Sequence, residues 1–169
     1  MPGKLLAGYY PGEFIKNPAF IKTSRLLEAG IRHIINLMEA SEQDGWGNDF
    51  DPYLEGMQTD AAARGLPKIT LARFPILDGN IPTRPEMSAI LDNIDKQIAS
   101  ERPVYVHCWG GRGRTGMVVG CYLIRHKLAT PENALEELQR LRRAAEDAGK
   151  ASPETPWQGA FVREWRPGE

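Results

Sequence analysis

Apolar and polar positions along the chain form blocks that predict strands alternating with helices. Short apolar runs predict strands at 4–10, 31–38, 68–76 and 104–106. Apolar residues at helical spacing predict helices over 17–30, 51–64, 83–98, 117–127, 130–141 and 152–165. The run 31–38 is almost continuously apolar, as expected of a central strand covered on both faces. The pattern predicts an α/β fold with a mostly parallel central sheet flanked by helices.

Several predicted helices carry start signals. Asn17-Pro18 is a cap followed by proline, and 83–86 is a capping-box pattern before an apolar stripe of Met87, Ile90, Leu91, Ile94 and Ile98. Thr130-Pro131-Glu132 predicts a helix with Leu135, Leu138 and Leu141 inward and with Arg142 and Arg143 on a solvated face. Ser152-Pro153-Glu154 resembles the cap of a last helix with Phe161, Val162 and Trp165 on its apolar face.

Length and composition limit the number of domains, the kinds of binding partner and the cellular location that we expect. A chain of 169 residues is most economically one domain, 1–169, with a substantial core, and we expect a monomer. A formal net charge of −1 argues against a nucleic-acid binder. No apolar run approaches bilayer length, so we expect no membrane insertion. The first six residues lack the apolar core of a signal peptide, and two cysteines without a disulfide framework suit a reducing compartment, so we expect a cytoplasmic protein.

The stretch 107–116 carries the clearest chemistry. It reads His-Cys-Trp-Gly-Gly-Arg-Gly-Arg-Thr-Gly and stands between a predicted strand and a predicted helix. A glycine-rich turn that leads into a helix N-terminus directs backbone N–H groups at one point and forms an anion site. The turn residues Trp109, Gly110, Gly111, Arg112 and Gly113 would supply these donors.

The residues that flank this turn suggest a nucleophile beside a bound phosphate. Cys108 stands at its start, and N–H groups of a helix N-terminus stabilise the thiolate that makes cysteine reactive. Arg114 at its end can bind two phosphate oxygens with its planar guanidinium, hold phosphorus in line with sulfur and stabilise the transition state. Thr115 could donate a hydrogen bond to sulfur and help the thiolate leave in a hydrolytic second step.

The leaving oxygen needs a proton from a carboxylic acid on a facing loop. Asp78 follows a predicted strand, but an Asp-Gly pair is also common turn chemistry. Asp44, Asp49 and Asp51 compete with it from the polar loop 39–52. That loop is either a solvated surface segment or the rim of the site, with Trp46 on the substrate. His33, inside an apolar run, is expected to be a core histidine.

Other interpretations of the glycine-rich turn are weaker. A Walker-type phosphate loop would have glycine at the position of Cys108 and lysine at that of Arg114. A zinc site would need more ligands than His107 and Cys108. We therefore expect no metal and no cofactor. A structural cysteine beside an ordinary turn would make the combination of thiol, glycines, arginine and threonine a coincidence.

Cys108, followed by five residues, Arg114 and Thr115, resembles the signature loop of the cysteine-dependent protein tyrosine phosphatase superfamily, and the compact size resembles its dual-specificity branch. Residues 75–82 resemble the general-acid loop of that branch, with Asp78 thirty residues before the cysteine. Residues 107–111 are similar to the loop of cyclin-dependent-kinase-associated phosphatases, which have tyrosine at the position of Trp109. Residues 5–12 resemble the opening of small bacterial relatives.

The resemblance implies a protein tyrosine or dual-specificity phosphatase. It makes Cys108 the nucleophile of a phosphocysteine intermediate, Arg114 the phosphate clamp and Asp78 the acid that later acts as base. It gives Thr115 the support of the thiolate and His107 the orientation of the loop. Gln158 lies where some relatives place a water-positioning glutamine, although a capping or surface glutamine fits equally well.

The substrate stays open at this stage. It would be a phosphorylated protein or a small phosphorylated molecule. Arg112 stands where inositide phosphatases of the superfamily carry lysine, and a second cation in the anion site would favour inositol phosphates unless this side chain faces outward. Other hypotheses are a phosphate-binding module without turnover and redox chemistry at Cys108, which would need Cys121 as a resolving thiol.

Overall fold

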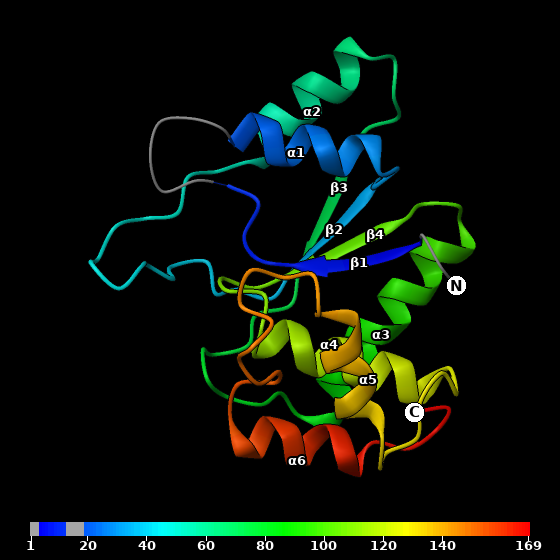
Figure 1. Cartoon of the computed structure of the whole chain (residues 1–169). Coiled ribbons are helices and arrows are strands. Elements are labelled where there is room, and N and C mark those ends of the chain that lie inside the picture. Colours follow the sequence, from blue (N-terminus) through cyan, green and yellow to red (C-terminus); the bar gives the residue numbers. More distant parts are fainter. Residues whose placement is uncertain (1–3, 13–18) are drawn as a thin grey trace.

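The computed structural model describes residues 4–12 and 19–169 and forms a layered α/β fold (Figure 1). The elements follow the order β1 (Leu5–Gly8), α1 (Ala19–Glu28), β2 (His33–Asn36), α2 (Leu54–Ala63), β3 (Thr70–Arg73), α3 (Arg84–Ala99), β4 (Val104–His107), α4 (Arg114–Arg125), α5 (Ala134–Leu141) and α6 (Pro156–Glu164). Strands and helices alternate as far as α4, as the sequence predicted.

The sheet is parallel, with the strand order β1-β4-β2-β3. Helices α1 and α2 lie together on one side of it, and α3 to α6 lie on the other (Figure 1). Because all four strands run in the same direction, their carboxyl ends meet at one edge of the sheet. The segments after β2, β3 and β4 therefore leave the sheet side by side, where α/β folds place their ligands.

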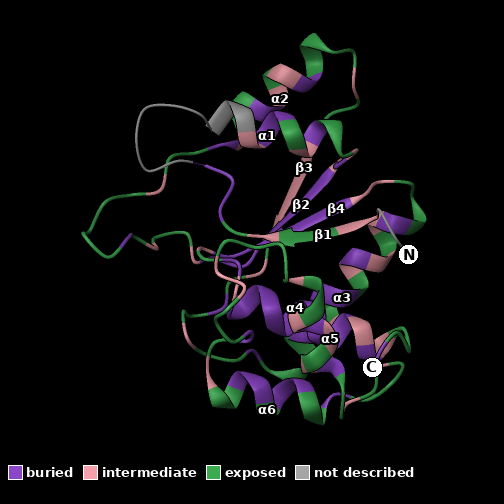
Figure 2. Ribbon diagram, viewed as in Figure 1, coloured by how far each residue is buried: buried purple, intermediate pink, exposed green. Residues whose placement is uncertain are grey.

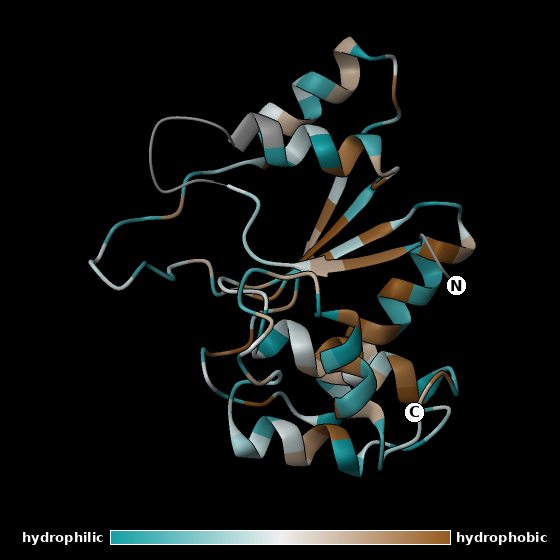
Figure 3. Ribbon diagram, viewed as in Figure 1, coloured by the Kyte–Doolittle hydropathy of each residue, from teal (hydrophilic) through white to brown (hydrophobic). Residues whose placement is uncertain are grey.

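Burial follows from this arrangement (Figure 2). The two inner strands, β2 and β4, are buried along their whole length, whereas the edge strands β1 and β3 are partly exposed. The helices carry both hydrophilic and hydrophobic segments, as expected of elements with one face on a core (Figure 3). His33 is a buried core histidine, as predicted, and its ring nitrogens lie 2.7 Å from Thr70 Oγ1 and 2.9 Å from Asn93 Oδ1.

Helix α3 confirms its sequence signals closely. Thr83 and Glu86 form a reciprocal capping box, and all five residues of the predicted stripe are buried. The cap predicted at Asn17 lies outside the described residues.

The later helices require corrections. Helix α6 begins at Pro156 with Thr155 as its cap, three residues after the predicted cap at Ser152. On α5, Leu138 is buried but Leu141 is exposed rather than inward, because the helix ends at this residue. No helix among the described residues is long and apolar enough to span a membrane.

Candidate active site

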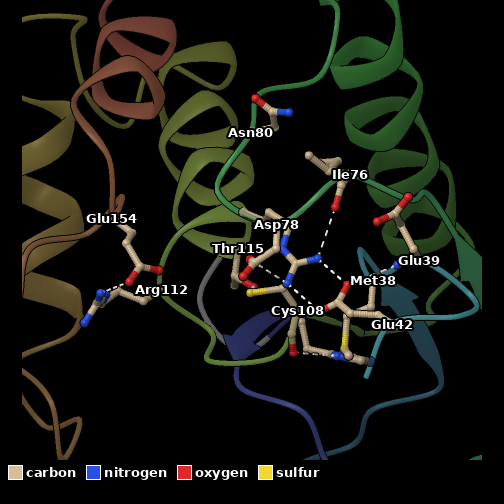
Figure 4. Close-up of polar contacts among 12 residues, drawn as sticks. Met38, Glu39, Glu42, Ile76, Asp78, Asn80, Cys108, Arg112, Thr115 and Glu154 are labelled. Carbon is tan, nitrogen blue, oxygen red and sulfur yellow. Dashed lines mark hydrogen bonds and ion pairs between the residues drawn. The ribbon is translucent and has the colours of Figure 1, made fainter. Parts of the chain in front are cut away.

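The residues 108–113, here called the cysteine loop, connect β4 to α4. Cys108 follows the last residue of β4, and its side chain is only 3% exposed. Thr115 Oγ1 donates a hydrogen bond of 3.1 Å to Cys108 Sγ (Figure 4). The sequence predicted these two groups on one anion site, and the structure brings them into contact.

Helix α4 begins at Arg114, three residues before the predicted start at Met117. Arg114 and Thr115 therefore belong to the first helical turn, and Gly113 occupies the cap position. The backbone N–H groups of a first turn have no partner within the helix, and they carry the positive end of the helix dipole. This end of α4 thus adds positive charge beside the buried sulfur.

Gly111 allows the cysteine loop to lie against the end of β1. Its φ of 68° belongs to the left-handed region that favours glycine. A Cβ atom there would lie 2.3 Å from the carbonyl carbon of Gly8 and 2.4 Å from the amide nitrogen of Tyr9. Nothing lies within 4 Å of the corresponding position at Gly110. Only Gly111 is thus required by both conformation and space.

Two side chains from the segment between α5 and α6 hold the cysteine loop from behind. The Arg142 guanidinium donates to the Gly111 carbonyl at 3.0 Å, and Ser152 Oγ donates to the Arg112 carbonyl at 2.8 Å. The predictions of a solvated Arg142 and a capping Ser152 were wrong. Both side chains bind carbonyl groups about 30 to 40 residues earlier in the chain, a long-range contact without a local sequence signal.

Arg114 is the hub of the site and is 1% exposed. Its guanidinium binds both carboxylate oxygens of Glu42, at 2.6 and 2.8 Å, and donates to the Ile76 carbonyl at 3.0 Å. Burial by itself would lower the pKa of Arg114, but the hydrogen bond to Glu42 and the nearby acidic groups raise it. Arg114 is therefore a permanent cation, and its Nε has no hydrogen-bond partner among the described residues.

Glu42 is a site residue that the sequence did not single out. The sequence suggested the polar loop 39–52 as the rim of the site, with Trp46 on the substrate. In the structure this loop contacts Arg114 through Glu42 instead. Trp46 is 84% exposed and thus the most exposed large apolar side chain described. The loop does approach the site elsewhere, because Phe50 and Trp109 pack edge to face with ring centroids 5.7 Å apart. Glu42 is one of five carboxylate residues in this loop, and nothing in the local sequence marks it as the partner of Arg114.

Asp78 is the aspartate that reaches the site. Its Oδ1 lies 2.8 Å from Arg114 Nη2, and its side chain is 60% exposed (Figure 4). Two competing aspartates are engaged within the polar loop instead. Asp44 accepts hydrogen bonds from the backbone of Trp46 and Asn48, and Asp49 accepts one from Gln43.

Arg112 faces Glu154 and forms an ion pair with it, to the side of Cys108 and Asp78 (Figure 4). The expectation of Arg112 as a second cation in the anion site is thus not met in this arrangement. The Arg112 charge is compensated by a carboxylate from the segment before α6.

Gln158 is fully buried, so it is not a surface residue. It completes the capping box of α6 with Thr155. Its Nε2 also donates to the Asn80 carbonyl at 3.1 Å, and its Oε1 would lie 3.0 Å from a Cβ atom at Gly113. Gln158 therefore contacts both the loop of Asp78 and the end of the cysteine loop.

His107 supports the cysteine loop from the sheet. Its Nδ1 lies 3.1 Å from the Cys108 carbonyl oxygen, and its Nε2 lies 2.7 Å from the Tyr53 hydroxyl. A carbonyl only accepts, so Nδ1 carries the hydrogen and Nε2 accepts from Tyr53. Burial lowers the pKa of His107 to about 4, and the ring is neutral near pH 7. Tyr53 is a second residue that the sequence did not indicate.

Cys108 and Cys121 are both buried free thiols. Burial raises the pKa of Cys121, which keeps this thiol protonated and poorly reactive. Among the described residues, no group of three or more His, Cys, Asp or Glu side chains could hold a metal ion.

Comparisons with known proteins point to one family. The family model described as "Polymorphic toxin system, DSP-PTPase phosphatase" matches residues 14–128. The chain is 39% identical over 61 residues to the phosphatidylglycerophosphate phosphatase PTPMT1 of Arabidopsis thaliana, covering 34% of this chain and 18% of that protein. It is 29% identical over 93 residues to cyclin-dependent kinase inhibitor 3 of Homo sapiens, covering 54% of this chain and 41% of that protein. It thus spans less than half the length of these relatives.

Solved structures share the fold. A kinase-associated phosphatase with its catalytic cysteine changed to serine matches with a TM-score of 0.67 and 22% identity, over 95% of this chain and 83% of that one. PTPMT1 in complex with PI(5)P matches with a TM-score of 0.68 and 21% identity, over 96% and 89% of the two chains.

Proposed function

Because the chain belongs to the DSP-PTPase phosphatase family of polymorphic toxin systems, we propose that it hydrolyses phosphate monoesters through a phosphocysteine intermediate. One observation carries this proposal. Cys108 follows β4, Asp78 lies in the loop after β3, and Arg114 is the first residue of α4. The Arg114 guanidinium is buried, lies 2.8 Å from Asp78 Oδ1 and is near enough to Cys108 for the charges to interact.

In the first step the Cys108 thiolate attacks the phosphorus atom. A phosphate placed against the first turn of α4 would meet its backbone N–H groups and, once Asp78 leaves Nη2, the Arg114 guanidinium with its buried, unpaired Nε. The sulfur–phosphorus bond forms as the bond from phosphorus to the leaving oxygen breaks. That oxygen takes the proton of the Asp78 carboxyl group.

Asp78 changes partners during this step. Its carboxylate lies on Arg114 Nη2, beside the Nε edge that would receive the phosphate. A bound phosphate replaces the carboxylate at this donor and places a second negative charge beside it. The Asp78 carboxyl group, released from Arg114, is then available to the leaving oxygen as proton donor.

In the second step water hydrolyses the phosphocysteine. The Asp78 carboxylate takes a proton from water as its oxygen attacks phosphorus, and the sulfur–phosphorus bond breaks. The Thr115 hydroxyl, 3.1 Å from sulfur, stabilises the departing thiolate. Inorganic phosphate leaves, and the thiolate and the carboxyl group are regenerated.

For the substrate, we favour a phosphorylated protein residue over an inositol polyphosphate. Arg112 is already paired with Glu154, so this carboxylate would repel a further phosphate at that side of the site. Inositol phosphates and other small phosphorylated molecules remain the alternative. The family description also suggests a role as the catalytic part of a polymorphic toxin system. A monomer in a reducing, cytoplasmic compartment remains our expectation, consistent with two free thiols.

A phosphate-binding module without turnover is the rival proposal, and a comparison of the wild type with one variant separates the two. We expect the wild type to hydrolyse 4-nitrophenyl phosphate and to be inhibited by vanadate. Cys108→Ser should lose turnover by at least about 10⁴-fold because the alcohol is not ionised, yet still bind phosphopeptides. Phosphopeptide binding by a wild type without any turnover would favour the binding module, and an active Cys108→Ser variant would contradict the mechanism.

The same pair of proteins identifies the substrate class. We would present the Cys108→Ser variant with phosphotyrosine peptides, phosphothreonine peptides and soluble inositol phosphates, and measure wild-type turnover on each. Preferential binding and turnover of the phosphopeptides supports our choice of substrate. A preference for inositol phosphates would support the alternative.

A further inference from the structure

The loop that carries Asp78 is held at one end by the active-site arginine. Arg114 donates to the Ile76 carbonyl, two residues before Asp78. The Asn80 amide then donates to the Leu77 carbonyl at 3.0 Å and closes a turn with Asp78 and Gly79 in its centre. The φ of 73° at Gly79 allows this turn. Asp78 thus lies on a tight turn that Arg114 holds only on its amino-terminal side.

That second anchor is the first turn of α6. Trp157 Nε1 donates to the Gly79 carbonyl at 2.7 Å, and Gln158 Nε2 donates to the Asn80 carbonyl at 3.1 Å. Two consecutive side chains therefore hold two consecutive carbonyl groups, 78 residues away in the chain. The carbonyl groups belong to the residues directly after Asp78, so α6 holds the backbone on this side of the Asp78 turn.

The two anchors differ in character. Gln158 is fully buried and also accepts hydrogen bonds from the amides of Glu154 and Thr155, so it organises the start of α6. Trp157 is 54% exposed, so water can replace the Gly79 carbonyl as partner of its indole N–H without disturbing the core. The Trp157 hydrogen bond therefore holds only the Asp78 turn. The Gln158 hydrogen bonds hold this turn and also the start of α6.

We propose that Trp157 is a positioning residue for proton donation, because its indole N–H holds the Asp78 turn at the distance from which the carboxyl group reaches the leaving oxygen. This inference rests on the proposed function and goes beyond it by assigning a role in catalysis to the start of α6. Trp157 acts through Asp78 and does not touch the reacting atoms.

The proposed role of Trp157 predicts how the rate of hydrolysis depends on the pKa of the leaving group. Protonation matters greatly for a leaving group with a high pKa and little for one with a low pKa. Loss of one hydrogen bond is worth about 0.5–1.5 kcal/mol, which corresponds to a rate change of about two- to tenfold. A displaced Asp78 turn should therefore slow phenyl phosphate hydrolysis by this factor and change 4-nitrophenyl phosphate hydrolysis by less than about twofold.

Trp157→Phe is the appropriate variant, because it keeps an aromatic ring and removes the N–H donor. We expect kcat for phenyl phosphate to fall by about two- to tenfold, with a steeper dependence of kcat on the pKa of the leaving group. Gln58→Leu is the matched control. Gln58 Nε2 makes the same kind of bond, 2.9 Å to the Ile69 carbonyl, but at the amino end of β3, opposite the site.

A second background shows whether Trp157 acts through the acid. In an Asp78→Asn protein there is no carboxyl group to position, so adding Trp157→Phe should change kcat no further. Equal losses for good and poor leaving groups, an additive effect in the Asp78→Asn background, or unchanged kinetics in Trp157→Phe would each overturn the inference. A wild type without turnover would instead refute the proposed function, so the two failures are distinguishable.

Discussion

At the scale of single residues, Glu42 determines how Arg114 is presented. Its two carboxylate oxygens bind Nη1 and Nη2 of the guanidinium and leave Nε without a hydrogen-bond partner among the described residues. Charge-assisted pairs of this kind fix direction as well as charge. Glu42 and Asp78 thus have different roles toward Arg114. Glu42 is largely buried and orients the guanidinium, whereas Asp78 is exposed and can be replaced by another partner.

We expect Glu42→Gln to lower kcat/KM for a phosphotyrosine peptide by about tenfold, because a neutral amide orients Arg114 less firmly than a carboxylate. The measurement is steady-state kinetics beside thermal unfolding, which shows whether the variant is folded. Glu146→Gln, at an exposed position, is the control. Unchanged kcat/KM in Glu42→Gln would show that Arg114 is oriented without Glu42.

At the scale of elements, the cysteine loop is supported by the end of β1 and by the segment between α5 and α6. The end of β1 touches Gly111, Arg142 after α5 binds the Gly111 carbonyl, and Ser152 binds the next carbonyl along the chain. The shape of the anion site is therefore a property of the packing between elements as well as of the loop sequence.

The adjacent glycines of the cysteine loop offer a matched pair of variants. Gly111→Ala combines a positive φ with backbone overlap against Gly8 and should cost about 2–4 kcal/mol of stability. Gly110→Ala meets no neighbour within 4 Å and should cost less than about 1 kcal/mol. Urea unfolding measures both. Equal losses of stability in the two variants would contradict the role of Gly111 at β1.

At the scale of the whole molecule, the fold keeps two histidines buried and neutral. Burial lowers the pKa of His107 to about 4 and also lowers that of His33. In the unfolded chain a histidine titrates near a pKa of about 6.5. As pH falls from 6.5 toward 4, the unfolded chain binds protons that the folded chain does not, so the free energy of unfolding falls.

We therefore expect the protein to lose about 2 kcal/mol of stability from His107 alone between pH 7 and pH 5. Urea unfolding at the two pH values measures this loss. His107→Asn should show a smaller loss, whereas Gln58→Leu, which removes no titratable group, should keep the full dependence. Stability that stays constant in the wild type over this interval would contradict the burial of neutral His107.

Local patterns in the sequence were sufficient for the class of fold and for the chemistry of one segment. Apolar periodicity reflects which faces are buried, so it predicted the strands, the stripe on α3 and the order of elements. The cysteine loop could be recognised because Cys108, its glycines, Arg114 and Thr115 are neighbours in the chain and their spacing is itself the signal. The caps predicted at Thr130 and Ser152 were wrong, because α5 is capped by Asn133 and α6 by Thr155, and several Ser, Thr and Pro residues compete for these positions.

Only the tertiary structure decided which distant side chains complete the site. Glu42, Tyr53, Arg142 and Trp157 each act through a contact across at least 31 residues, and nothing near them in sequence marks the partner. Arg112 was ambiguous for the same reason, because its direction depends on Glu154. The sequence determined the proposed nucleophile and its proposed anion site through local spacing. The fold chose the partners of Arg114 and the anchors of the Asp78 turn, because parallel strands and the return of α6 bring distant segments to one edge of the sheet.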